Sequence, residues 1–325
     1  MSTVPRIVGT RLLQAVPLLI ATVVVNFAII HLAPGDPVTM MVGEGAVSAG
    51  QMETLRESLG LNNPLHIQFL DYLTSVLQGD LGTSYVYHQP VSEIIAARIP
   101  ATLLLMGSTY LLSTFFGLLF GIVAALRPAS LQDRVLMTIA ILGYSVPTFW
   151  LGFIALMIFA VELGWLPISG MVESGLEPGS WEYWKSVLHH LVLPVAVLSL
   201  FYTGLIARLM RTSMLNSLRR DFIVTARAMG LSSWRIVLRH AVPNAITPIV
   251  TVLGLQIGLM LSGAVLTETV FGWPGLGVLT VQAVAQRDYP LLLGMFLLTS
   301  VMVIIANVLT DLVYLAINPR LRSNG

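Results

Sequence analysis

Residues that commonly carry out catalysis are sparse in this chain and form no catalytic pattern. Cysteine is absent, which excludes disulfides, thiol nucleophiles and cysteine-ligated zinc. The single lysine, Lys185, follows Trp184, whereas a phosphate-binding loop places glycine directly before its lysine. The patterns HExxH and GxSxG are both missing, and the adjacent His189 and His190 would point in different directions on a helix. We therefore expect a non-catalytic chain that itself binds no metal, no ATP and no other cofactor.

A second group of chemically capable side chains lies within or at the ends of long apolar stretches: Asn26, Gln256, Glu268, Asn307 and Asp311. Ionisable groups inside a membrane span mark functional sites by default, while amides there either line a path or join helices. We take all five as candidates for a translocation path. The competing interpretation places Glu268 at the outer interface and Asp311 near the cytoplasmic end of a span, both within reach of water.

The third group is basic. Residues 219–244, RRDFIVTARAMGLSSWRIVLRHAVPN, contain five of the sixteen arginines of a chain that is 56% apolar. Seven arginines lie between Arg208 and Arg239. Burying them at the centre of a bilayer would cost about 20 kcal/mol, since each contributes roughly 2.5–3.5 kcal/mol. The basic segment must therefore lie outside the membrane.

Membrane-spanning helices are the elements that must position these groups. Only 10% of the residues are charged, against about a quarter in soluble domains, and mean hydropathy is +0.84. Of the 17 lysines and arginines, 13 fall near the two termini, in 127–134 or in 208–239, so the positive-inside rule predicts that both termini are cytoplasmic. We expect an all-α polytopic membrane protein with six transmembrane helices, formed by the apolar stretches 9–32, 101–126, 135–162, 187–210, 245–268 and 291–317.

The predicted external segment after the first span carries helix signals of its own. In NNPLHIQFLDYLTSVLQG, Asn63 is expected as the N-cap, Pro64 as the first helical residue and Gly79 as the end. A second short helix is expected in SAGQMETLRESLG, ending at Gly60. These signals predict a small extracytoplasmic helical subdomain over 33–100. Further along, GWPGLG (272–277) is expected as a tight external turn into the last span.

The basic segment itself is predicted to form two short helices around a glycine. Asp221 is expected to cap a helix over 222–229 that Gly230 ends, and Ser232 or Ser233 to cap the next helix. The second helix has an apolar stripe at helical spacing, made by Trp234, Val237, Leu238 and Ala241. Periodicity alone leaves two interpretations equal: an interfacial helix pair held by anionic lipid, or a docking element for a cytoplasmic partner.

The spacing of this segment resembles the loop E-A-A-x3-G-x9-I-x-L-P of ABC importer permeases. Gly230 takes the glycine position and Pro243 the terminal proline. Val224 stands at the glutamate position, and Thr225 and Ala226 stand at the two alanines. The loss of the glutamate removes one expected polar contact to an ATPase but leaves the helix–glycine–helix frame.

Further motifs along most of the chain resemble the dipeptide/oligopeptide/nickel permease family, and in particular its first-permease (B-type) subunit, closest to dipeptide permeases. They are HLAPGDP (31–37), GDLGTSY (79–85), RIPATLLL (98–105), YSVPTFWLG (144–152), GLQIGLMLSGAVLTETVFGWPGLG (254–277) and RDYP (287–290). The resemblance implies a multi-pass permease of the bacterial cytoplasmic (inner) membrane that imports di- or oligopeptides. Nickel or glutathione-like peptides are the alternative substrates.

The same resemblance implies partners: a second homologous permease subunit, two ATP-binding subunits that hold ATP and Mg²⁺, an extracytoplasmic substrate-binding protein and the lipid bilayer, with no nucleic acid. It also implies an ATPase-coupling set, Thr225, Ala226, Arg227, Gly230, Ser233, Trp234, Arg235 and Pro243. The chain would divide into an N-terminus with the first span (1–32), the external subdomain (33–100), a five-helix permease core (101–317, with the coupling segment at 211–244) and a cytoplasmic tail (318–325).

Two other classes of function are weighed against this interpretation. An ATP-independent secondary transporter or channel would need inverted repeats or a charged relay across the spans, and neither is visible. An intramembrane enzyme would need a catalytic pattern, but HExxH, GxSxG and cysteine are all absent.

Overall fold

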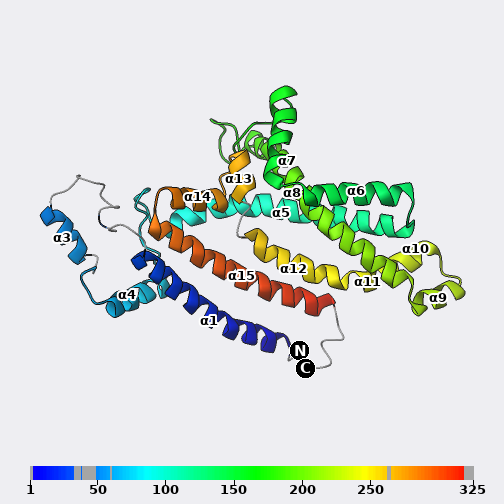
Figure 1. Ribbon diagram of the computed structural model, residues 1–325, viewed down its shortest axis with the longest axis horizontal. Helices are drawn as coiled ribbons and strands as arrows, with labels where there is room; N and C mark the ends of the chain where they lie inside the picture. Colours follow the sequence, from blue (N-terminus) through cyan, green and yellow to red (C-terminus); the bar gives the residue numbers. More distant parts are fainter. Residues whose placement is uncertain (1–2, 33–37, 39–48, 59–60, 262–264, 318–325) are drawn as a thin grey trace.

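The computed structural model describes residues 3–32, 38, 49–58, 61–261 and 265–317, and these form helices joined by turns. Within this part of the chain, the strand-like pairing is a single isolated bridge between Thr83 and Pro90. Figure 1 shows an elongated body in which the long helices run side by side, with the first helices at one end and the basic helix pair at the other. The expected all-α class is confirmed.

The described parts of the six predicted apolar stretches are mostly helical. They correspond to α1 (Thr3–Leu32), α5 (Val91–Leu126), the segment from α6 (Leu131–Ser145) to η1 (Leu156–Glu162), α8 (Trp181–Leu218), α12 (Thr247–Leu261) with α13 (Val265–Phe271), and α15 (Tyr289–Ile317). By length and composition, three helices of the described chain could cross a membrane, or up to five if each of two bent pairs counts as one span. The described apolar part of α1 adds a shorter segment, Leu13–Ile29. The number of spans and their sidedness remain predictions.

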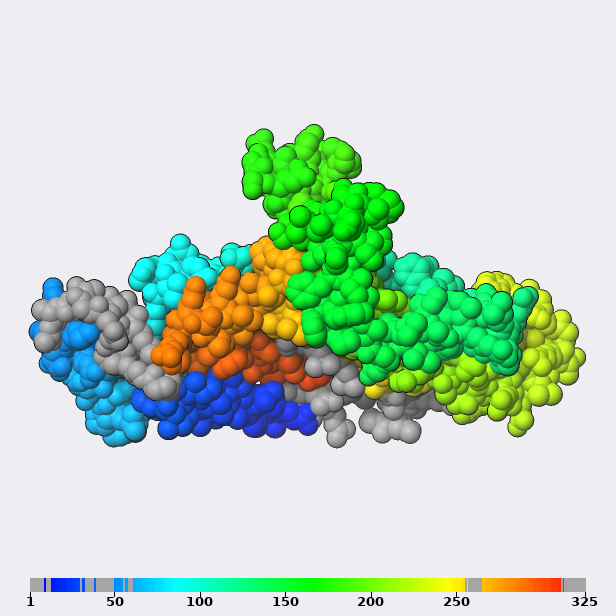
Figure 2. Space-filling model, turned by 45° about the horizontal axis from the view of Figure 1, so that its top comes forward, coloured from blue at the N-terminus to red at the C-terminus, as the bar shows by residue number. Residues whose placement is uncertain are grey.

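The third stretch, 135–162, is not the single straight span that hydropathy suggests. α6 (Leu131–Ser145) stops, and α7 (Thr148–Ala155) continues into the π-helical η1 (Leu156–Glu162) after a bend of 103°. Pro147 explains the break, because it lacks an amide hydrogen and disfavours helical geometry at Val146. The second half projects from the body, as Figure 2 shows for the green segment.

The longest pair of helices, α5 and α8, packs closely through two glycines that are four residues apart on α5. A Cβ atom on Gly117 would lie 2.6 Å from the Cβ of Ile206, and one on Gly121 would lie 2.6 Å from that of Met210. In the fifth stretch, α12 (Thr247–Leu261) approaches α15 in the same way, because a Cβ on Gly254 would collide with Thr310. Small residues thus set the helix spacing, as expected for membrane bundles.

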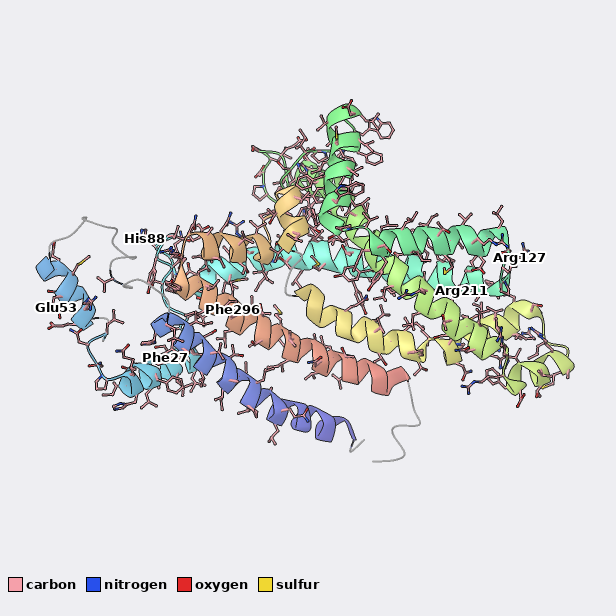
Figure 3. All side chains as sticks on the ribbon, viewed as in Figure 1. Phe27, Glu53, His88, Arg127, Arg211 and Phe296 are labelled. Atoms are coloured by element: carbon pink, nitrogen blue, oxygen red, sulfur yellow. The ribbon has the colours of Figure 1, made fainter. Side chains whose placement is uncertain are left out.

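The external segment contains both predicted helices, α3 (Ala49–Ser58) and α4 (Leu65–Leu77). α4 starts one residue later than expected, with Pro64 rather than Asn63 as its N-cap, and Gly79 ends it with a φ of +81°. α4 rests on the end of α1, where Phe27 lies 5.2 Å from Phe69 between ring centroids (Figure 3). Gly60 and most of the connection 33–48 lie outside the described residues, so the extent of the subdomain stays a prediction.

Candidate functional site

The basic segment folds as a helix, a glycine turn and a second helix, as its sequence predicts. α9 (Asp221–Ala228) is closed by Gly230, whose φ is +75°. The Gly230 amide donates to the Arg227 carbonyl at 2.9 Å, and the Leu231 amide donates to the Ala226 carbonyl at 3.2 Å. This pair of bonds is a Schellman motif, which requires a left-handed residue at the position of the glycine.

The second helix is continuous over residues 233–245 but contains a π-helical turn. α10 (Ser233–Ile236) passes into η2 (Val237–Ala241) and then into α11 (Val242–Ala245). Pro243 cannot donate a main-chain hydrogen bond, which favours a local change of helical register around it. The Ser217 hydroxyl at the end of α8 donates to the Ala241 carbonyl at 3.0 Å, so η2 is tied to α8.

One predicted cap is wrong and the other is confirmed in position. Arg220, not Asp221, is the N-cap of α9, whereas Ser232 is the N-cap of α10 as expected; neither residue makes a side-chain cap bond. The predicted apolar stripe is divided between two environments: Val237 and Ala241 are buried inside the chain, whereas Trp234 and Leu238 are 66% and 45% exposed. The buried face also includes Ile236 and Ala245, because that side meets α8 and α12.

A buried apolar cluster fastens the helix pair to the long helices. From the pair it takes Ile223, Ala226, Ile236, Val237, Ala241 and Ala245; from the rest of the chain it takes Ala125, Ile206, Met210, Met214, Ile249 and Leu253. Ala226 is 3% exposed, so it belongs to this inner anchor rather than to the outer surface. The pair therefore shares one buried core with α8 and α12.

The pair exposes several large apolar side chains together with arginines. These apolar side chains are Val224, Met229, Trp234 and Leu238, which are exposed by 63%, 71%, 66% and 45%. The remaining members of the predicted coupling set apart from Ala226 are also exposed: Thr225, Arg227, Gly230, Ser233, Arg235 and Pro243. We call Val224, Met229, Trp234 and Leu238 the docking face. If the pair lies outside the bilayer, as its arginines predict, exposed apolar side chains of this kind are typical of a protein-interaction site.

The predicted path residues are not gathered into one site. Asn26 joins helices: its amide donates to the Leu293 carbonyl of α15 at 3.2 Å, and it also bonds Tyr72. Burial raises the pKa of the Tyr72 phenol, and the bond to Asn26 opposes that rise. Asn307 is exposed on α15, and the side chain of Asp311 lies outside the described residues.

Gln256 is different, because it is buried without a partner. Its side chain on α12 is 4% exposed, and neither its amide nitrogen nor its amide oxygen has a hydrogen-bond partner in the described chain. A buried amide without partners is costly, so this residue keeps its place as a path candidate.

Glu268 lies in a closed network rather than at an open interface. Its carboxylate is fully buried in α13 (Val265–Phe271) and accepts from the Thr102 hydroxyl at 3.2 Å and from the Val278 amide at 3.1 Å. The Thr102 oxygen in turn accepts from the Leu276 amide at 2.8 Å. The water-exposed placement at the end of a span is therefore wrong for Glu268.

The GWPGLG motif wraps around this carboxylate. A Cβ on Gly275 would lie 2.4 Å from the Glu268 carboxyl carbon, so only glycine fits there. The Trp273 indole donates to the Ala101 carbonyl at 2.8 Å and locks the turn onto α5. The turn does not lead directly into the last span as predicted, because α14 (Leu276–Ala285) intervenes before α15.

The sequence interpretation missed a second buried carboxylate, Asp288. It accepts a hydrogen bond from the Ser84 hydroxyl and bonds of 3.3 Å from the amides of Tyr85 and Leu291. The signal was present in RDYP, since an aspartate before a helix with proline near its start is an N-cap pattern. GDLGTSY and RDYP are therefore two halves of one contact between the external segment and α15.

Metal chemistry finds no support in the described residues, which contain no group of three or more histidine, aspartate or glutamate side chains placed to hold an ion. His189 and His190 each contact main-chain carbonyls instead, of Trp165 at 3.0 Å and of Ser186 at 2.8 Å.

Comparison with known proteins defines the class. The profile of the family described as "Binding-protein-dependent transport system inner membrane component" matches residues 117–323, and that of its N-terminal part matches residues 4–106. The chain belongs to this family. It is thus an integral membrane protein and the permease component of a binding-protein-dependent ABC importer, as its motifs suggested.

Particular relatives narrow the class. The chain is 41% identical to the di/tripeptide transport system permease protein DppB of Pseudomonas aeruginosa, over 97% of this chain and 98% of that protein. It is 42% identical to the glutathione transport system permease protein GsiC of Salmonella typhi and 38% identical to the oligopeptide transport system permease protein AppB of Bacillus subtilis, each over 96% of this chain and 97% of the relative.

Among solved structures, an inward-facing MetNI methionine ABC transporter matches with a TM-score of 0.55 at 17% identity, over 70% of this chain and 97% of that chain. At this identity the likeness supports the fold alone.

Proposed function

We propose that this chain is the first (B-type) permease subunit of an ATP-driven importer of di- and oligopeptides in the bacterial inner membrane. Its partners are a second homologous permease subunit, two ATP-binding subunits and an extracytoplasmic substrate-binding protein. ATP and Mg²⁺ are held by the ATP-binding subunits, and this chain performs no catalysis. The observation that carries the proposal is the docking face, which is apolar, exposed and rigidly anchored from behind.

The anchoring gives the mechanism its physical basis. When ATP binding closes the two ATP-binding subunits, a helix pair seated in their surface moves with them. The buried cluster transmits this displacement to α8 and α12, because its members come from the pair and from both long helices. The bundle then changes the face to which its pathway opens. Thr225, Arg227, Ser233 and Arg235 supply polar contacts at the edge of the docking face.

The names of the relatives favour short peptides as the transported class. Permeases named for di- and tripeptides, oligopeptides and glutathione are similar to this chain at comparable identity. Glutathione is itself a small peptide, so a glutathione-like peptide is the second candidate substrate.

Uptake by the co-expressed complex tests the proposal. Di- and tripeptides should compete for uptake of a labelled peptide, and nickel should not. Transport by the purified chain alone in liposomes, without ATP, would instead support a secondary transporter.

The proposed orientation has its own test, which the absence of cysteine makes clean. Gln89 and Ser233 are both exposed, in the external segment and in α10. Cysteine placed at Gln89 should react with an impermeant maleimide from outside intact cells, and cysteine at Ser233 only after lysis. The reverse pattern would invert the orientation.

A further inference from the structure

A basic groove lies between α6 and α8, away from the docking face and from the candidate path. Residues of α6 and α8 line a cavity of about 330 Å³: Asp133, Arg134, Met137, Ala140, Ile141, Arg208, Arg211 and Thr212. Figure 3 labels Arg211 on α8 and Arg127 at the turn before α6, both at the same end of the bundle. The groove therefore sits where a hydrophilic turn leads into an apolar helix.

One of its arginines is already neutralised. Arg211 binds Asp133 through two parallel hydrogen bonds, from Nε at 2.6 Å and from Nη2 at 2.7 Å. Asp133 is 4% exposed and also accepts from the Ala129 amide at 2.8 Å. A single carboxylate carries one negative charge, and Asp133 accepts its guanidinium hydrogen bonds from Arg211 rather than from Arg134 or Arg208. Three guanidinium groups against one carboxylate leave the lining with a formal charge of +2.

The shape of the groove is that of an amphipathic ligand site. α6 and α8 meet closely beyond it, since a Cβ on Gly204 would lie 2.2 Å from the Ala140 carbonyl oxygen. The Arg208 guanidinium lies 5.6 Å from the centroid of the Tyr144 ring. This aromatic ring adds an apolar surface next to the groove. Along α6 the cationic end gives way to Met137 and then to Ile141, which is 54% exposed, and both line the groove at helical spacing.

We propose that this groove binds the headgroup of an anionic phospholipid. Arg134 and Arg208 face the phosphate, for which arginine offers a forked pair of donors, and an acyl chain lies along Met137 and Ile141. A soluble anion would use the two arginines but not the exposed apolar track beside them. Basic pockets between helices at the membrane boundary bind such headgroups in other proteins. Either orientation of the chain places the groove at that boundary.

The bound lipid would brace the joint between α6 and α8. Arg211 lies one turn before Met214, which belongs to the buried cluster behind the helix pair. The lipid composition of the membrane would thereby affect α8, the same helix that is proposed to transmit the displacement of the helix pair.

The test uses the complete complex, purified with its partner subunits and depleted of lipid. Binding of phosphatidylglycerol and of phosphatidylcholine is measured by native mass spectrometry and by thermal stabilisation. The test variant is Arg134→Gln with Arg208→Gln, which leaves the Arg211–Asp133 pair intact. The matched control is Arg127→Gln with Arg220→Gln, which removes two exposed arginines outside the groove.

The wild type and the control should retain phosphatidylglycerol in preference to phosphatidylcholine. The test variant should bind it about 30-fold more weakly, since each arginine near an anionic lipid contributes a factor of about five. Excess inorganic phosphate should not displace the lipid. Equal retention by test and control variants, equal binding of the neutral lipid, or displacement by phosphate alone would each overturn the proposal. If the glutamine pair fails to assemble, Arg134→Ala alone and Arg208→Ala alone should each weaken binding about fivefold, and no loss in either would equally overturn it.

Discussion

The Ser217 hydroxyl donates a buried hydrogen bond of 3.0 Å to the main-chain carbonyl of Ala241. Ser217 ends α8, and Ala241 closes the π-helical turn of the second helix of the pair. This bond is a direct polar link between a long helix and the element proposed to meet the ATP-binding subunits. Four predictions follow from this link and its surroundings.

Ser217→Ala should loosen the link. The Ala241 carbonyl would stay buried without this partner, which costs about 1–3 kcal/mol. We expect a lower midpoint of thermal unfolding for the complex and less peptide imported per ATP hydrolysed. Asn216→Ala, at an exposed neighbouring position of α8, is the control and should change neither quantity. Wild-type stability in the Ser217 variant would show that the bond contributes nothing.

Gly230→Val should uncouple the importer while the chain still inserts into the membrane. Nothing lies within 4 Å of a Cβ placed on Gly230, so the penalty is confined to its backbone angle of +75°. A left-handed residue other than glycine costs about 1–2 kcal/mol, and asparagine tolerates that conformation best. Gly230→Asn should therefore retain coupling that Gly230→Val loses. Equal peptide transport per ATP in the two variants would contradict the role of the turn.

Trp234→Ser should weaken the attachment of the ATP-binding subunits. Exposed tryptophans at protein interfaces commonly contribute 2 kcal/mol or more to binding, which corresponds to roughly a 30-fold loss of affinity. The measurement is co-purification of the ATP-binding subunits with the tagged permease at graded salt. Trp181→Ser, 77% exposed at the other end of α8, is the matched control. Loss of the ATP-binding subunits in the Trp181 control but not in the Trp234 variant would show that the docking face is not where these subunits bind.

Thr102→Val should destabilise the chain without changing substrate preference. The Thr102 hydroxyl both donates to Glu268 and accepts from the Leu276 amide, so its removal leaves two buried groups short of a partner. We expect a loss of about 2–4 kcal/mol in stability. Thr280→Val is the comparison, because the Thr280 hydroxyl bonds only its own helix, at the Leu276 carbonyl. A changed order of peptide competition in the Thr102 variant would place Glu268 on the path after all.

Much of this molecule could be predicted from composition and spacing. Hydropathy placed the long helices, and a glycine followed by a regular apolar pattern placed the turn at Gly230. The rotation of the second helix could not be predicted in this way. Its sequence is apolar on more than one side, and only contact with α8 and α12 decides that Ile236 is buried and Trp234 exposed. The 103° break at Pro147 could have been predicted from the proline itself. A hydropathy average over the whole stretch does not detect it.

The buried polar network was beyond the sequence for a different reason. Thr102 and Glu268 are 166 residues apart, and Ser84 and Asp288 are 204 apart. Spacing rules describe neighbours along a helix and carry no information about such partners. Glu268 therefore looked like an isolated ionisable group, and Asp288 drew no attention.

The bond between Ser84 and Asp288 also sets an order of events during synthesis. Asp288 leaves the ribosome 204 residues after Ser84, which at about 5–20 residues per second is a delay of roughly 10–40 s. Throughout that interval the nascent external segment has no carboxylate to close upon, while the intervening helices are being inserted. This end of the bundle can therefore close only when translation is almost complete.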